Sequence, residues 1–282
     1  MEKILIFGAN GQLGRAFVRL LDASGVSFVS ADRAACDITR PTEVERLLDL
    51  HRPTVAVNCT AYNLVDDAED NPELAFAVNA EAVKTVAAAA AQRQIKFVHY
   101  STDFVFDGCK RQPYVESDMP NPLSVYAKSK LAGEEYTKAA GGDYLLFRVS
   151  WVVGDGKQNF LYKVSQWAAK TDTLRIADDE VSVPTSADTI ARVSRQAWQE
   201  GLSGLYHLAS SGQASRYELT RFYLDLIGLK DKTVLPVPMA SFPAKARRPG
   251  YSVLSNAALS RALGVTLPDW KEGLQEFFGG SS

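Results

Sequence analysis

Short apolar runs alternate with segments of helical length through the first half of this sequence. The runs are KILIFG, VSFVSAD, TVAVNCTAY, IKFVHYST and YLLFRVSW, and they are separated by segments such as QLGRAFVRLLDAS and PTEVERLLDLH. This alternation is typical of a parallel sheet with helices on both faces. Because the runs are almost continuously apolar, they suit strands that are buried on both sides. The sequence therefore predicts an α/β fold with a Rossmann-type doubly wound parallel sheet.

The pattern loosens after residue 151, where polar and proline-rich stretches interrupt shorter elements. These stretches include GDGKQN, SSGQAS and PVPMASFPAKARRPG. We therefore expect a dinucleotide-binding domain over residues 1–150 and a smaller, mainly substrate-binding part over residues 151–282, with elements that return to the sheet within residues 181–208. Ligands of such folds bind outside the carboxyl ends of the strands, so functional residues are expected there.

Bulk composition argues against several classes of protein. The chain of 282 residues has a formal net charge of −2 and scattered Lys and Arg residues, so it lacks the basic surface of a nucleic-acid-binding protein. Cys36, Cys59 and Cys109 show no ligand spacing, which argues against a zinc site or a disulfide framework. The sequence has no signal-peptide pattern and no run of about 18 apolar residues, and we expect a cytoplasmic protein that does not enter a membrane.

The segment GANGQLG places three glycines between the first strand and the first helix. Gly8, Gly11 and Gly14 allow a tight turn, close approach of a pyrophosphate to the backbone, and close packing of the helix on the strand. Asp32 closes the second strand and can accept hydrogen bonds from an adenosine ribose, whereas the adjacent Arg33 can bind a 2'-phosphate. The cofactor is therefore expected to be NADPH or NADH, unless Asp32 and Arg33 form only a solvated turn.

A tyrosine and a lysine lie one helical turn apart in the segment SVYAKSKLAGEE. The spacing of Tyr126 and Lys130 puts both side chains on one face of a helix, where the ammonium would lower the pKa of the phenol. Such a phenol can protonate a carbonyl oxygen while a hydride reaches the carbon. Ser101, Thr102 and Asp103 end the strand IKFVHYST, and a hydroxyl there could hold the same oxygen. The simpler alternative is a surface tyrosine beside a solvated lysine.

Seven ordered motifs resemble those of the extended short-chain dehydrogenase/reductases, and within them of the dTDP-4-dehydrorhamnose reductase family. The motifs are GANGQLG, AYNLVDDAE, YSTDFVFDG, VYAKSKLAGE, FRVSW, GLYHL and RRPGYSVL, and they span nearly the whole chain. The resemblance implies NAD(P)H-dependent reduction of the 4-keto group of a nucleotide-linked 6-deoxy sugar, with dTDP-L-rhamnose as the product.

The resemblance also implies roles for individual residues. Thr102, Tyr126 and Lys130 would be the catalytic set, in which Tyr126 gives the proton, Lys130 lowers its pKa and Thr102 orients the ketone. The implied cofactor-binding residues are Gly8, Gly11, Gln12, Leu13, Gly14, Asp32, Arg33, Ala61, Tyr62 and Lys130. The implied substrate-binding residues are Thr102, Asp103, Tyr126, Trp151, Asn159 and Arg248. From the residues alone, Trp151 could equally be a core side chain and Arg248 a solvated loop arginine.

The chain departs from the family pattern at three places. In DEVSVPT, residues 179–185, Glu180 replaces an amide and Ser182 replaces a glycine, so the identity of the sugar is less constrained than the reductase chemistry. Val153 stands where a tyrosine is usual. The first helix has Arg15 and Ala16 in the region where some members carry a glutamate that binds a metal between two subunits. We therefore expect no metal site, and either a monomer or a homodimer that forms through another surface.

The residue after Asp103 bears on the type of reaction. Related sugar-nucleotide dehydratases carry an aspartate followed by a glutamate at this point, because the removal of water needs both an acid and a base. Phe104 follows Asp103 here, which favours plain reduction of a ketone. Two alternatives remain open, a non-catalytic NADP-binding regulatory subunit and a 4-ketoreductase for a different nucleotide deoxysugar.

Overall fold

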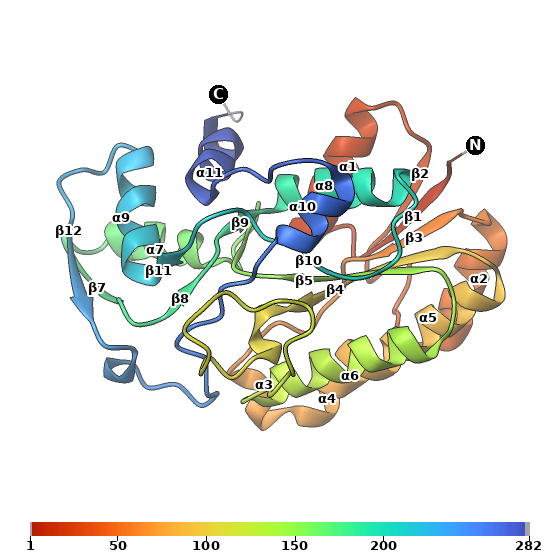
Figure 1. Cartoon of the computed structure of the whole chain (residues 1–282), viewed down its shortest axis with the longest axis horizontal. Coiled ribbons are helices and arrows are strands. Elements are labelled where there is room, and N and C mark those ends of the chain that lie inside the picture. The colour runs from red at the N-terminus through yellow and green to blue at the C-terminus, as the bar shows by residue number, and fades with distance from the viewer. Residues whose placement is uncertain (1, 280–282) are drawn as a thin grey trace.

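The computed structural model describes residues 2–279 and has a six-stranded parallel sheet at its centre (Figure 1). In spatial order the strands are β10 (Gly204–His207), β5 (Tyr144–Val149), β4 (Lys96–Thr102), β3 (Val55–Asn58), β1 (Ile4–Phe7) and β2 (Phe28–Ala31). The strand order reverses between β1 and β3, which makes the carboxyl end of β1 the switch point where such sheets bind ligands. The predicted doubly wound α/β fold is confirmed.

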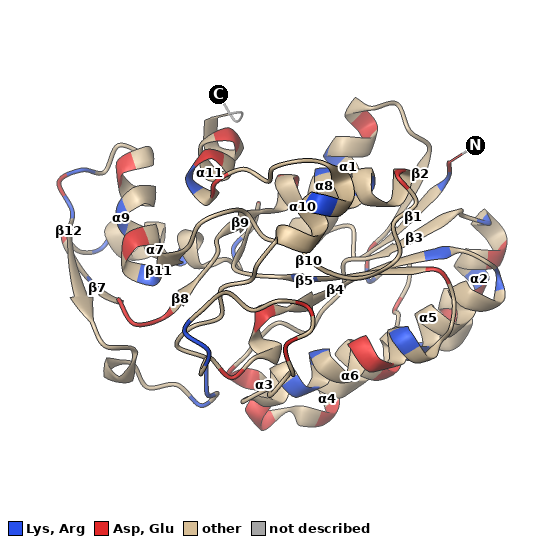
Figure 2. Ribbon diagram, viewed as in Figure 1, with Lys and Arg blue, Asp and Glu red and all other residues tan. Residues whose placement is uncertain are grey.

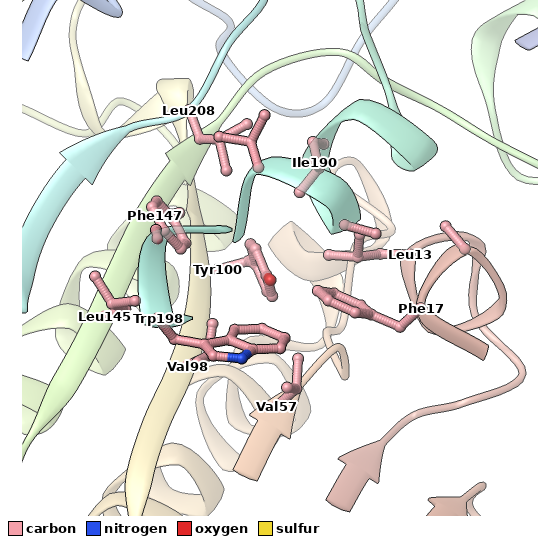
Figure 3. Packing of buried hydrophobic residues seen from close by; sticks show 14 of the residues in the cluster. Leu13, Phe17, Val57, Val98, Tyr100, Leu145, Phe147, Ile190, Trp198 and Leu208 are labelled. Carbon is pink, nitrogen blue, oxygen red and sulfur yellow. The ribbon is translucent and has the colours of Figure 1, made fainter. Parts of the chain in front are cut away.

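Helices cover both faces of this sheet, which explains why its strands are apolar on both sides. One face carries α1 (Gln12–Ala23), α8 (Ala187–Gln199) and α10 (Ala257–Leu263), and the other carries α2 (Pro41–His51), α5 (Ala82–Gln92) and α6 (Val125–Ala139). Figure 3 shows Phe17 of α1 and Trp198 of α8 packed together over the sheet, with their rings stacked 5.8 Å apart. All four residues of β1 are buried.

The helical segment before β4, residues 67–92, is divided. It contains the short helix α3 (Asp67–Asp70), α4 (Pro72–Phe76), a π-helical turn at Ala77–Glu81, and α5. The side chain of Asn79 in the π-helical turn exchanges two hydrogen bonds with the backbone of Tyr62, at 2.8 and 2.9 Å. Such turns often accompany functional sites, and this one fixes the segment that follows β3.

Length and composition alone would allow one helical stretch among the described residues, Pro72–Gln92, to cross a membrane. Half of its most apolar window is buried inside the protein, as in a helix that packs on a core. The buried residues of α5 are mainly alanine and valine, and they face the cluster that also contains Leu5 and Phe97.

The second half of the chain builds a smaller part with its own apolar core. Its helices are α7 (Phe160–Ala168), α9 (Arg216–Leu226) and α11 (Trp270–Gly279). Its strand pairs are β7 (Thr173–Ala177) with β12 (Thr233–Val237), β8 (Val181–Ser182) with β11 (Ala214–Ser215), and β6 (Val152–Val153) with β9 (Thr185–Ser186). Short 3-10 turns lie at Asp103–Val105 and Met239–Ser241. Between these elements, α8 and β10 return to the large sheet, and β10 forms its edge.

Candidate active site

The glycine turn after β1 brings the start of α1 very close to the strand. Gly8 has a φ of +76°, in the left-handed region that favours glycine. A Cβ atom on Gly14 would lie 2.3 Å from the carbonyl oxygen of Gly8, so a larger residue could not pack here. Gly11 is the N-cap of α1 and supplies no side-chain cap, which leaves the first amide groups of the helix available to an anion.

Asp32 is held in a turn beside the glycines. One carboxylate oxygen accepts hydrogen bonds from the backbone amides of Ala34 and Ala35, each at 3.0 Å, and the other accepts one from the Asn10 side chain at 2.8 Å. Asp32 therefore closes the turn after β2 and is also tied to the glycine turn. Asn10, which forms this link, was not identified from the sequence. Arg33 is exposed next to it.

The three predicted catalytic residues meet at the carboxyl end of β4. Thr102 is the last residue of β4, and Tyr126 lies in the first turn of α6, which Ser124 caps through a hydrogen bond from the Ala127 amide. The Thr102 hydroxyl acts on the Tyr126 phenol and favours a lower pKa of that group. Lys130 is buried one turn along α6, and its ammonium donates to the carbonyl oxygen of Tyr100 at 2.6 Å.

The pKa of Tyr126 differs from the value expected from the sequence. Burial raises the pKa of Tyr126 to about 12, although the Thr102 hydroxyl acts in the opposite direction. Burial lowers the pKa of Lys130 to about 8, against the raising effect of Glu134. The predicted low pKa of Tyr126 is wrong for this structure, because burial of the phenol raises its pKa, and the Lys130 ammonium donates to the Tyr100 carbonyl.

Asp103 lies behind Thr102 and accepts hydrogen bonds from three hydroxyl groups. Thr102 donates to it at 3.1 Å, Ser182 at 2.8 Å and Ser252 at 2.5 Å. Burial raises the pKa of Asp103 to about 6, while these hydroxyls and Arg216 oppose that rise. The two serines lie 79 and 149 residues away from Asp103 in the chain, so no local sequence pattern could have revealed the cluster.

A cavity of about 900 Å³ opens beside these residues, outside the carboxyl ends of the strands. All six predicted substrate-binding residues line it, namely Thr102, Asp103, Tyr126, Trp151, Asn159 and Arg248. Of the predicted cofactor-binding residues, only Gln12 does so. The structure thus gathers the substrate set around one cavity. The rest of the cofactor set lies on the glycine turn and the start of α1, after the ends of β2 and β3 and, for Lys130, on α6.

Arg216 and Glu180 shape one wall of this cavity. They form an ion pair at 3.1 Å, and the guanidinium lies over the Trp151 ring at 3.5 Å and the Phe160 ring at 4.6 Å. Trp151 has a φ of +36°, and its buried indole nitrogen has no hydrogen-bond partner among the described residues. Glu180, which departs from the family pattern, therefore forms an ion pair with Arg216, and the Arg216 guanidinium packs over the Trp151 ring.

Two predicted substrate-binding residues are engaged within the protein. Asn159 caps α7 by accepting a hydrogen bond from the Tyr162 amide at 2.8 Å, and its amide group donates to the Gly154 carbonyl at 2.6 Å. Arg248 forms a forked ion pair with Asp66, at 3.0 and 2.6 Å. The Arg248 hydrogen bond holds the pKa of Asp66 below its usual range.

The ion pair between Arg248 and Asp66 is one of two that connect the C-terminal part of the chain to the start of α3. Lys245 pairs with Asp70 of α3 in the same way, and Figure 2 shows the basic segment before residue 250 near the acidic start of α3. The carboxylates of the segment AYNLVDDAE thus lie at the start of α3, and one of them, on Asp66, also lines the cavity.

A buried charged group lies beneath the catalytic helix. Arg148 of β5 binds both carboxylate oxygens of Glu134 on α6, at 2.9 and 2.7 Å, and all three of Glu134, Arg148 and His207 are almost completely buried. The Arg148 guanidinium also lies 3.4 Å from the His207 ring nitrogen, and burial together with Arg148 lowers the pKa of His207 to about 3. The Glu134 carboxylate raises the pKa of Lys130. The cluster of Glu134, Arg148 and His207 therefore connects β5 to the active site.

The residues present fit a nicotinamide dinucleotide better than a metal ion. The open start of α1 suits a pyrophosphate, and the buried side-chain oxygen of Gln12 has no partner among residues 2–279, so it is available to a ligand. Within the same range, no group of three or more His, Cys, Asp or Glu side chains is arranged to hold a metal ion.

Comparison with known proteins gives consistent matches over the whole chain. The family model described as RmlD substrate binding domain matches residues 1–281. A dTDP-4-dehydrorhamnose reductase of Burkholderia thailandensis is 38% identical, with 95% of each chain covered, and a dTDP-4-keto-6-deoxy-D-glucose reductase of Streptomyces niveus is 34% identical, with 98% of this chain and 96% of the relative covered. The crystal structure of a Bacillus anthracis dTDP-4-dehydrorhamnose reductase in complex with NADP is 31% identical and matches with a TM-score of 0.94 over 99% of both chains.

Proposed function

This chain belongs to the dTDP-4-dehydrorhamnose reductase family, and from that premise we propose that it is a sugar-nucleotide 4-ketoreductase that uses NADPH to convert dTDP-4-dehydro-L-rhamnose into dTDP-L-rhamnose. The observation that carries this proposal is the placement of Tyr126 and Thr102 together on the wall of the cavity, with Lys130 one helical turn from Tyr126 on α6. A phenol in that position can give a proton to a ketone oxygen.

The reaction divides between proton and hydride transfer. When bound, reduced nicotinamide supplies the hydride to the carbonyl carbon. Tyr126 gives its proton to the carbonyl oxygen, and Thr102, which also lines the cavity, orients the ketone. Lys130, one helical turn from Tyr126 on α6, would bind the nicotinamide ribose, as the resemblance implies. The surrounding protein buries the reacting groups, so charges near them act more strongly than they would in water.

The cofactor would be held by the residues around the switch point of the sheet. These are the residues implied by the family resemblance, from the glycine turn through Asp32, Arg33, Ala61, Tyr62 and Lys130. We propose that residues 1–150 bind the dinucleotide and that residues 151–282 mainly bind the sugar nucleotide. The exposed Arg33 beside Asp32 supports a preference for NADPH, because a guanidinium suits a 2'-phosphate.

The sugar nucleotide would lie along the cavity, with the ketone at Tyr126 and the phosphates at a basic wall. Lys163, Arg175 and Arg247 line the cavity, and among the described residues none of the three forms an ion pair. Arg248 could join them if the substrate replaces Asp66 as its partner. These side chains suit the two negative charges of a nucleoside diphosphate.

Glu180 and Arg216 support a second candidate, a 4-ketoreductase for a different nucleotide deoxysugar. They form the wall beside Trp151, and Glu180 departs from the family pattern. We further propose that the protein acts in the cytoplasm as a monomer or homodimer, with a small nucleotide sugar as its partner, and that its product serves cell-surface polysaccharide synthesis.

We expect purified protein to oxidise NADPH only when a nucleotide-linked 4-keto sugar is present. The measurement is the loss of reduced-nicotinamide absorbance with dTDP-4-dehydrorhamnose, compared with other nucleotide-linked 4-keto sugars and with NADH. Faster turnover of another sugar would favour the second candidate. Binding of NADPH without turnover of any sugar would instead support a non-catalytic, cofactor-binding subunit and overturn the proposal.

A further inference from the structure

Arg216 and Glu180 are held together by a short two-stranded ribbon at the edge of the cavity. β8 and β11 pair in antiparallel register, with Val181 opposite Ser215. The backbone amide of Arg216 continues this pairing, because it donates to the Glu180 carbonyl oxygen at 3.2 Å. Both side chains line the cavity. The backbone thus fixes the two charged groups next to each other in the cavity wall.

The ion pair between these side chains leaves one donor and one acceptor free. The Nε and Nη2 groups of Arg216 donate to the same oxygen of Glu180, at 3.3 and 3.1 Å. Among residues 2–279, no group forms a hydrogen bond with Nη1 of Arg216 or with the other carboxylate oxygen of Glu180. Two neighbouring hydroxyl groups of a ligand can therefore bind here, one as an acceptor from Arg216 and one as a donor to Glu180.

The charges of this pair suit neutral hydroxyl groups better than a phosphate. Glu180 already balances the positive charge of Arg216, and its carboxylate would repel a phosphate. Basic side chains that form no ion pair within the described part of the chain line the same cavity, at Lys163, Arg175 and Arg247. The diphosphate has better partners there, which leaves Arg216 and Glu180 for the sugar ring.

The pair lies about one sugar ring away from the position of the reacting ketone. Ser182 of β8 donates to Asp103 at 2.8 Å, and Asp103 follows Thr102 in the chain. Glu180 lies two residues before Ser182, and two residues of extended chain span roughly 7 Å. A pyranose ring with its ketone at Thr102 therefore directs its other ring carbons toward Glu180.

We propose that Arg216 and Glu180 are specificity-determining residues that together bind the neighbouring hydroxyls at C2 and C3 of the sugar. This inference rests on the proposed ketoreductase function and narrows its substrate class. The preferred substrates are nucleotide-linked 4-keto-6-deoxyhexoses that keep both hydroxyls, and the related 2-deoxy sugars are poor substrates.

The experiment compares kcat/KM for dTDP-4-dehydrorhamnose with kcat/KM for its 2-deoxy analogue, at saturating NADPH. The wild type should prefer the sugar with both hydroxyls by about 10- to 100-fold, because the analogue leaves a charged group of the site without its partner. The ratio of the two kcat/KM values is the readout.

The double variant Arg216→Met, Glu180→Gln removes both charges with little change in volume, and it leaves neither charge unpaired. Its kcat/KM for the sugar with both hydroxyls should fall about tenfold, while kcat/KM for the 2-deoxy analogue should stay nearly unchanged. Glu180→Gln alone is a milder change and should lose part of the preference. The matched control is Arg93→Met, Asp49→Asn, which breaks an ion pair of 2.8 Å outside the cavity and should leave the ratio unchanged.

A purely structural role for Arg216 gives a different result. If its guanidinium only supports the Trp151 ring, the double variant should lower kcat/KM for both sugars by the same factor. An unchanged ratio in the double variant, or equal kcat/KM of the wild type for the two sugars, would overturn this inference and leave the ketoreductase function intact. A wild type that reduces neither sugar would overturn both.

Discussion

Replacing Tyr126 by phenylalanine is expected to lower kcat by about 10²- to 10⁴-fold, because it removes the proton donor and almost no volume. The ring remains in place, since it packs edge-on against Phe104 with the ring centroids 6.2 Å apart. Binding of NADPH, measured by fluorescence titration, should be unchanged. The kcat is measured by NADPH oxidation at saturating keto sugar.

A matched control for this variant is Tyr136→Phe on the same helix. The Tyr136 hydroxyl bonds to Glu81 at 3.0 Å and lies outside the cavity, so its loss should leave kcat near the wild-type value. If Tyr126→Phe keeps wild-type kcat while binding NADPH normally, another group must protonate the ketone, and the assignment of Tyr126 fails.

Replacing Arg148 by methionine is expected to lower the free energy of unfolding by about 3 to 5 kcal/mol. The Glu134 carboxylate is fully buried and depends on Arg148 for two hydrogen bonds, at 2.9 and 2.7 Å. Without the guanidinium, this charge would have no comparable partner in the interior. The measurement is urea unfolding, in which the midpoint should fall with little change in the slope.

Two further variants separate this effect from general damage to the protein. Lys232→Met breaks a pair with Asp172, whose side chain is 89% exposed, and should leave the unfolding midpoint almost unchanged. Adding Glu134→Gln to Arg148→Met removes the unpaired charge and should recover part of the loss. A cost for Arg148→Met no larger than that of Lys232→Met would contradict the structural role of the buried pair.

The sequence was sufficient to predict the sheet because its signals are local. Each run such as KILIFG is apolar over its whole length, and that pattern follows from burial on both faces. The division of the long helix was not predicted, because the π-helical turn depends on contacts between Asn79 and the backbone of Tyr62, 17 residues away. Alanine-rich sequence gives no local sign of such a contact.

In the candidate site, too, residues within one helix could be predicted from the sequence, but contacts between distant segments could not. Tyr126 and Lys130 could be paired from their spacing, because one helix determines their separation. The surroundings of Asp103 could not be predicted, since Ser182 and Ser252 reach it from β8 and from a distant loop. The pKa of Tyr126 was predicted in the wrong direction for a related reason, because burial of the phenol raises it, and the spacing of Tyr126 and Lys130 does not reveal that burial.

The most direct test of hydride transfer to the ketone uses NADPH that carries deuterium at C4 of the nicotinamide. After turnover with dTDP-4-dehydrorhamnose, the sugar product is examined by NMR. We expect one of the two C4-deuterated epimers of NADPH to deliver deuterium to C4 of the sugar, in an amount equal to the NADPH consumed. NADPH consumption without deuterium at that carbon from either epimer would contradict ketone reduction in this cavity.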